Sequence, residues 1–125
     1  CKMFNDLGAD VTAASRKYLT VAEAESNGLN ACLIKDLNKY TQVADVIINT
    51  VPVKILSKEF IDLIKDGAIV IDISSAPYGF DYDYAKKIGK KITLLPSIPG
   101  RYFPETAGEI IADTIMNIIE EGDFE

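Results

Sequence analysis

Apolar residues along the chain form two kinds of pattern that alternate from one end to the other. Short continuous runs, richest at Val46-Ile47-Ile48 and Ile69-Val70-Ile71, indicate strands in a parallel sheet. Between the runs, apolar residues spaced three or four apart indicate amphipathic helices. Strands that alternate with helices are typical of the α/β class with a doubly wound parallel sheet.

These patterns predict where each element lies. Strands are expected at 11–14, 30–33, 45–49, 68–73 and 92–95. Helices are expected at 3–7, 18–27, 36–43, 57–65, 81–88 and 105–120. The strand at 45–49 is apolar enough to be buried on both of its faces.

Several residues predict where helices begin and end. Asp36, Ser57 and Asp81 each precede a helical stripe and can accept a hydrogen bond as its N-cap. Gly8 and Gly28 follow helical stripes and can end them in the left-handed conformation. The connections between elements are therefore expected to be short, as in other α/β proteins.

The sequence opens with a helix rather than with a strand. In a doubly wound sheet the first strand lies at the centre, and the turn after it carries the glycines that grip phosphate. Neither precedes the opening helix. We therefore expect residues 1–125 to form a single, partial dinucleotide-binding domain with a vacancy between its first and third strands. Such a fragment is expected to be inactive by itself.

Composition narrows the possible partners. The net charge of −6 and the lack of a basic stripe argue against nucleic acid. The longest apolar runs fall far short of the ~20 residues that cross a bilayer, so no membrane association is expected. Cys1 and Cys32 make no disulfide framework and suggest reduced thiols in a cytoplasmic protein.

The chain contains no histidine. This excludes a Ser-His-Asp triad, a Cys-His pair and an ordinary zinc site within it, and we predict no metal. Any proton transfer must use a carboxylate, lysine, tyrosine or water. No catalytic acid or base is evident, and Asp72 is expected to be a structural residue at a strand end.

Ser15, Arg16 and Lys17 follow the first strand, and ligands of open α/β sheets bind at such carboxyl ends. An acidic residue there would hold the ribose hydroxyls of NAD, whereas a hydroxyl and two cations favour the 2′-phosphate of NADP. The alternative is that Arg16 and Lys17 are solvated charges at the start of a helix. Cations are slightly unfavourable at that position.

Two further strand ends are candidates for the same coenzyme. Thr50, Val51 and Pro52 form a flat loop that can run beneath a ligand, although a plain strand-terminating turn fits them nearly as well. Ser74 and Ser75 bring small side chains to the middle of the cleft, where a nicotinamide ring could approach the backbone. Serines are also ordinary loop residues.

The last strand end is a proline-rich loop that leads into the final helix. Pro99 and Gly100 are expected to border the nicotinamide, and the helix N-terminus beyond them suits an anionic group. Arg101 could bind a substrate carboxylate with both arms of its guanidinium group. The alternative is that Arg101 is an exposed loop residue without a binding role.

At these loops the sequence resembles the dinucleotide-binding domain of one family, that of the dipicolinate synthase A subunit. The stretches that carry the resemblance are ADVIINTVP at 44–52, IDISSAPYGFDYDYAKKIG at 71–89 and LLPSIPGRYFPETAG at 94–108. The last is the most specific, and the spacing matches over essentially the whole chain. The resemblance implies a Rossmann-like fold.

The resemblance also implies an activity and partners. The activity is NADP-dependent oxidation of dihydrodipicolinate, a small dicarboxylate, to dipicolinate during sporulation. The implied partners are an N-terminal domain and a flavoprotein-like B subunit of the synthase, in a homo-oligomer. Ten residues would contact NADP: Ser15, Arg16, Lys17, Thr50, Val51, Pro52, Ser74, Ser75, Pro99 and Gly100. Two alternatives stay open, namely a related shikimate or 2-hydroxy acid dehydrogenase and a non-catalytic nucleotide-binding module.

Overall fold

The computed structural model describes residues 1–98, 101, 104–106, 108–109 and 112–113. Its helices are α1 (Lys2–Asp6), α2 (Tyr18–Ser26), α3 (Asn38–Thr41), α4 (Lys58–Leu63) and α5 (Tyr82–Lys87), with a 3-10 turn, η1 (Ile34–Asp36). Its strands are β1 (Thr12–Ser15), β2 (Asn30–Leu33), β3 (Val46–Asn49), β4 (Ile69–Asp72) and β5 (Ile92–Leu94). Most of the expected final helix, 105–120, lies outside the described residues.

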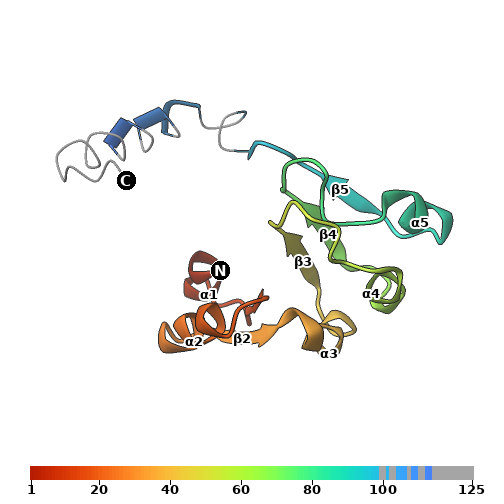
Figure 1. Ribbon diagram of the computed structural model, residues 1–125, viewed down its shortest axis with the longest axis horizontal. Coiled ribbons are helices and arrows are strands. Elements are labelled where there is room, and N and C mark those ends of the chain that lie inside the picture. The colour runs from red at the N-terminus through yellow and green to blue at the C-terminus, as the bar shows by residue number, and fades with distance from the viewer. Residues whose placement is uncertain (99–100, 102–103, 107, 110–111, 114–125) are drawn as a thin grey trace.

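The strands form two separate parallel sheets (Figure 1). One sheet pairs β1 with β2, and the other has the order β3-β4-β5. Among the described residues, β1 and β3 each lack a partner on their other edge. The expected α/β fold with parallel strands is confirmed.

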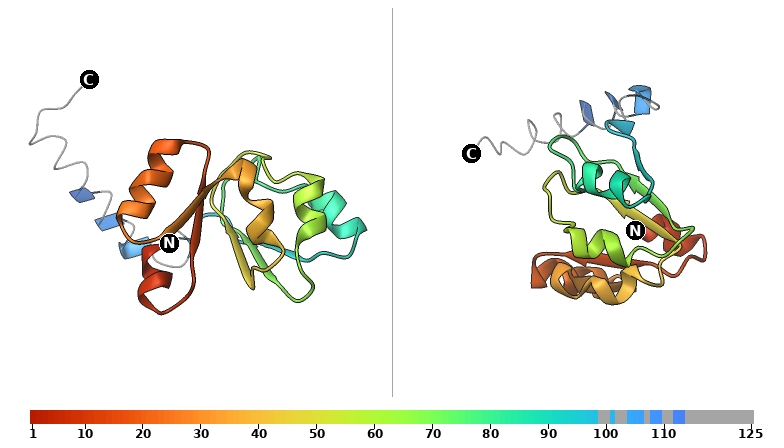
Figure 2. Two further views of the ribbon diagram at one scale, coloured as in Figure 1. Left: turned by 90° about the horizontal axis from the view of Figure 1, so that it is seen from below. Right: turned by 90° about the vertical axis from the view of Figure 1, so that its right-hand side faces the viewer.

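Helices lie on two sides of the strands. In the left view of Figure 2, α4 and α5 lie on one side and α1 and α2 on the other. The buried core is formed where α4 and α5 pack on the β3-β4-β5 sheet. Its members are Leu56, Phe60, Ile61, Ile64, Val70, Phe80 and Ala85.

Most of the predicted helix caps are present. The Ser57 side chain accepts a hydrogen bond from the Phe60 amide, and the Asp81 side chain accepts one from the Tyr84 amide. Gly8 and Gly28 have φ angles of +90° and +76°, as expected of residues that end a helix.

The prediction that Asp36 caps a helix through residue 43 is wrong. Asp36 ends the turn η1 instead, and the residue before α3 is Leu37, which provides no side-chain cap. Leu37 packs against the core, and its carbonyl accepts hydrogen bonds from the Tyr40 and Thr41 amides of α3.

The expectation that β3 is buried on both faces is also wrong for the described residues. Ile47 and Asn49 point toward the helices, whereas Val46 is 50% exposed and Ile48 is 38% exposed. The described helices that pack on this three-stranded sheet cover only one of its faces. An apolar run can therefore predict a strand correctly without predicting what covers it.

None of the helices in the described part of the chain has the length and apolar content needed to cross a membrane.

Replacing Ile61, which is fully buried in α4, tests the position of the core. We expect Ile61→Ala to lower the free energy of unfolding of the full chain by about 2–5 kcal/mol, because the substitution leaves a cavity. The matched control is Val43→Ala at a position that is 69% exposed, for which a change below about 0.5 kcal/mol is expected. Equal effects in urea denaturation would contradict this core.

Candidate functional site

The carboxyl ends of β3 and β4 lie side by side because the two strands pair in parallel. Their register puts Asn49 opposite Asp72, each the last residue of its strand. Both side chains are on the face of the sheet that carries the helices, and both are buried. Ligands of open α/β sheets bind at this edge, so these two residues lie beneath the candidate site.

Asp72 is fully buried and accepts five hydrogen bonds from described residues. Its Oδ1 accepts from Asn49 Nδ2 at 3.0 Å, from the Ser74 amide at 2.9 Å and from Ser74 Oγ at 2.6 Å. Its Oδ2 accepts from the Gly79 amide at 3.0 Å and from Tyr82 Oη at 2.8 Å. A buried carboxylate needs such donors, because an unpaired charge away from water is very costly.

The hydrogen bonds change the acidity of two groups. Burial alone would raise the pKa of Asp72, but the bonds from Ser74, Gly79 and Tyr82 outweigh it and hold the pKa below its ordinary value. Burial, together with the hydrogen bond to Asp72, raises the pKa of Tyr82. Asp72 is therefore charged and Tyr82 neutral near pH 7, which makes both structural groups rather than proton carriers.

Asn49 connects this carboxylate to the loop that follows β3. Its Nδ2 donates to Asp72 and also to the Val51 carbonyl at 3.0 Å, while its Oδ1 accepts from the Val51 amide at 3.2 Å. The Asn49 side chain thus holds both backbone groups of Val51. The conformation of the loop at 50–52 is set by the same buried cluster that holds Ser74.

The loop after β4 folds closely over Asn49. A Cβ atom at Gly79 would lie 2.1 Å from Asn49 Nδ2 and 2.7 Å from its Cγ, so only glycine fits there. The preceding residue, Tyr78, has a φ of +66°, which is uncommon outside glycine. The Tyr78 amide donates to the Ser75 carbonyl at 3.0 Å and closes a tight turn.

The predicted residues of these two loops are brought together by the cluster, but their exposure differs. Thr50, Pro52 and Ser75 are exposed, and Val51 is half-buried. Ser74 is only 3% exposed, and its hydroxyl donates to Asp72. The Ser74 side chain is therefore committed to holding the loop, and the exposed neighbours are the groups open to a ligand.

Ser15 is the last residue of β1 in the other sheet, and Arg16 and Lys17 follow it directly. The Lys17 amide donates to Ser15 Oγ at 3.2 Å, and this local turn leads into α2. Arg16 and Lys17 are exposed, and neither forms an ion pair with the described residues. Both cations are thus accessible at a strand end, as an anion-binding role requires.

The last predicted group lies at the edge of the described chain. Pro99 and Gly100 fall outside the described residues. Arg101 is exposed, and its amide donates to the Ser97 carbonyl at 3.0 Å. The roles predicted for these three residues stay predictions.

The buried hydrogen-bonding or packing roles of Asn49, Gly79 and Tyr82 were not predicted from the sequence. One signal was available for Asn49, which stands two residues after Ile47 and hence on the same face of its strand. A polar residue on a buried face needs a partner, and the paired strand supplies Asp72. Nothing in the local sequence indicates that Gly79 lies against Asn49, thirty positions away.

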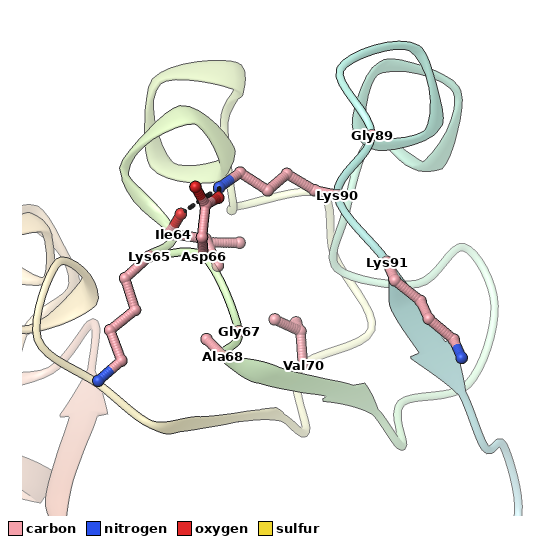
Figure 3. Close-up of a pocket in the computed structure, with 9 residues that line it drawn as sticks. All are labelled: Ile64, Lys65, Asp66, Gly67, Ala68, Val70, Gly89, Lys90 and Lys91. Atoms are coloured by element: carbon pink, nitrogen blue, oxygen red, sulfur yellow. Dashed lines mark hydrogen bonds and ion pairs between the residues drawn. The ribbon is translucent and has the colours of Figure 1, made fainter.

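A cavity of about 220 Å³ lies at the amino ends of β4 and β5 in the same sheet (Figure 3). It is lined by residues before β4 and β5, and Lys90 crosses it to pair with Asp66 at 2.7 Å. Lys90 Nζ also donates to the Ile64 carbonyl at the end of α4, where a cation is favoured. The Lys90 side chain thus caps α4 across this cavity, which lies away from the carboxyl ends of the strands. Among the described residues, no group of acidic or cysteine side chains could hold a metal ion.

The parallel strands of the two sheets alternate along the chain with helices, and polar loops follow their carboxyl ends. This arrangement makes the chain a Rossmann-like α/β protein. The resemblance to the A subunit of dipicolinate synthase is confirmed. The chain is 32% identical over 120 residues to that protein from Bacillus subtilis. The matched stretch covers 96% of this chain and 40% of the relative. The crystal structure of the same protein from Bacillus halodurans matches with a TM-score of 0.82 and 32% identity, covering 94% of this chain and 40% of that one.

A second group of relatives shares a shorter stretch. The bifunctional protein FolD of Hydrogenobaculum is 29% identical over 85 residues, which is 65% of this chain and 30% of that protein. No family model matches the chain. The chain spans about 40% of the length of the dipicolinate synthase proteins it resembles.

The charge on Asp72 can be tested through the pH dependence of stability. The lowered pKa means that Asp72 stabilises the fold at pH values above the ordinary carboxyl pKa, and that this stabilisation is lost as pH falls through the lowered value. We expect Asp72→Asn to lower the free energy of unfolding by about 3 kcal/mol or more at pH 7. Asparagine replaces one of the two accepting oxygens with an NH2 group, which leaves buried donors without their acceptor. The difference from the wild type should shrink below about pH 4.

The measurement is chemical denaturation of both proteins from pH 3 to pH 7. The control is Asp83→Asn in the exposed first turn of α5, which should cost less than about 1 kcal/mol. A cost for Asp72→Asn that stays constant down to pH 3 would show that its charge is not the stabilising factor.

Proposed function

We propose that this chain is the coenzyme-binding part of an NADP-dependent dehydrogenase that oxidises dihydrodipicolinate to dipicolinate during sporulation. The observation that carries the proposal is the pair of loops held together over Asn49 and Asp72, at the edge where α/β proteins bind ligands. The similarity to the A subunit of dipicolinate synthase over 96% of the chain supports the choice of reaction.

NADP is the coenzyme that the exposed groups suit best. Ser15, Arg16 and Lys17 offer a hydroxyl and two cations at one strand end, which matches the chemistry of a 2′-phosphate. Thr50, Val51 and Pro52 would line the ribose and pyrophosphate side. Ser74, Ser75, Pro99 and Gly100 would border the nicotinamide, with Ser74 acting through the loop that it holds.

The coenzyme supplies the hydride acceptor for this reaction. The dihydropyridine substrate would give up a hydride and a proton to become the aromatic dicarboxylate, and NADP⁺ would supply the acceptor for the hydride. Because aromatisation provides much of the driving force, the chain has mainly to orient the reacting carbons and exclude water. Arg101, exposed beside the proline-rich loop, would bind a carboxylate of the substrate.

The wider assembly follows from the same proposal. We expect a cytoplasmic homo-oligomer that works with the B subunit of dipicolinate synthase, in which residues 1–125 form one dinucleotide-binding domain. A related dehydrogenase with another substrate is the second candidate. The similarity to FolD over 65% of the chain favours it, because a Rossmann-type domain is compatible with more than one substrate.

Turnover with defined substrates separates these two candidates. The full-length protein should reduce NADP when dihydrodipicolinate is supplied, measured by the absorbance of the reduced nicotinamide. Shikimate and 2-hydroxy acids serve as the comparison substrates. Activity with one of them and none with dihydrodipicolinate would establish the second candidate instead.

Arg16 and Lys17 can be tested by coenzyme preference. We expect Arg16→Ala/Lys17→Ala to weaken NADP binding about tenfold or more, because charge-assisted hydrogen bonds to the 2′-phosphate are lost. NAD lacks this phosphate, so its affinity should be nearly unchanged. The control is Lys86→Ala/Lys87→Ala, which removes two exposed cations at the end of α5. Tighter binding of NAD than NADP by the wild type would refute the assignment.

A further inference from the structure

We propose that Asn49 is a positioning residue that locks the loops after β3 and β4 into one coenzyme-binding surface, with Gly79 as the residue that makes room for it. This inference rests on the proposed function, because it assigns a role in coenzyme binding to residues that do not touch the coenzyme. Asn49 is 6% exposed, so its side chain is not available to a ligand.

The first step of the argument is the set of bonds that Asn49 makes. Its amide group holds the Val51 carbonyl and amide on one side and the Asp72 carboxylate on the other. Asp72 in turn holds the Ser74 and Gly79 amides. A single side chain therefore connects the backbone at 51 to the backbone at 74 and 79 through one buried acceptor.

The second step is that the two loops also meet through their backbones. The Leu56 amide donates to the Gly79 carbonyl at 3.2 Å, and Leu56 and Phe80 form a parallel bridge. The Gly79 peptide is thus held by Asp72 through its amide and by Leu56 through its carbonyl. The loops are joined at both ends, so displacement of Gly79 would also displace residues 50–52 and 75.

The third step is steric. A Cβ at Gly79 would overlap the Asn49 amide, at 2.1 Å from Nδ2 and 2.7 Å from Cγ, and both distances are far shorter than real contacts. Gly79 and Asn49 therefore form a matched pair in which the small residue admits the large polar one. Removal of the Asn49 amide would relieve the overlap but would also remove the bonds to Val51 and Asp72.

This pairing gives an experiment that separates positioning from mere structure. The variants are Gly79→Ala, Asn49→Ala and the double variant Asn49→Ala/Gly79→Ala, each in the full-length protein. Stability is measured by chemical denaturation, and affinity by fluorescence titration with NADPH. The matched control is Asn38→Ala, at an exposed asparagine of α3.

We expect Gly79→Ala to lose both stability and affinity, because the new Cβ displaces Asn49. The double variant should regain the stability of Asn49→Ala, since the overlap is gone, yet bind NADPH about tenfold or more weakly than wild type. Hydrogen exchange should show lost protection at 50–56 and 73–80 in Asn49→Ala, with no change in the β1-β2 sheet. Asn38→Ala should leave both measurements unchanged.

The results that would overturn the inference are distinct. Wild-type affinity in folded Asn49→Ala, or recovery of affinity together with stability in the double variant, would show that Asn49 is only structural. Unchanged hydrogen exchange at 73–80 in Asn49→Ala would show that the loops are not coupled. Failure of the wild-type protein to bind either NADPH or NADH would overturn the proposed function itself, and this inference with it.

Discussion

The buried carboxylate of Asp72 is the constraint on which the site depends. An ionised group without water costs several kcal/mol unless protein donors replace its hydration, and no described cation pairs with it. The donors come from one strand, one loop and one helix: Asn49 ends β3, Ser74 and Gly79 lie in the loop after β4, and Tyr82 begins α5. Because all of them must converge on one point, the loops have little freedom in how they leave the sheet.

The apolar core and this polar cluster support each other. Phe80 is fully buried next to Gly79, and its ring lies near those of Phe60 and Tyr82, with centroids 6.2 and 6.4 Å apart. Packing of Phe80 against α4 keeps the loop over the sheet, and the hydrogen bonds to Asp72 keep the carboxylate satisfied. Thr50, Pro52 and Ser75 remain exposed beside this buried cluster.

The predicted site is divided between two sheets. Arg16 and Lys17 follow β1 of one sheet, and the loops organised by Asp72 follow β3 and β4 of the other. The free edges of β1 and β3 carry unpaired backbone groups among the described residues, and such edges favour the addition of a strand.

The element order, most strand positions and the caps at Ser57 and Asp81 could be predicted from the order of residues alone, because they follow from local periodicity and side-chain hydrogen bonding. The strand-end loops could be located in the same way. Packing in three dimensions was needed to show that α3 begins at Asn38, that one face of β3 is exposed, and that the Ser74 hydroxyl is turned inward. Those features depend on contacts between residues far apart in the chain, such as Gly79 against Asn49, and no local pattern records such contacts.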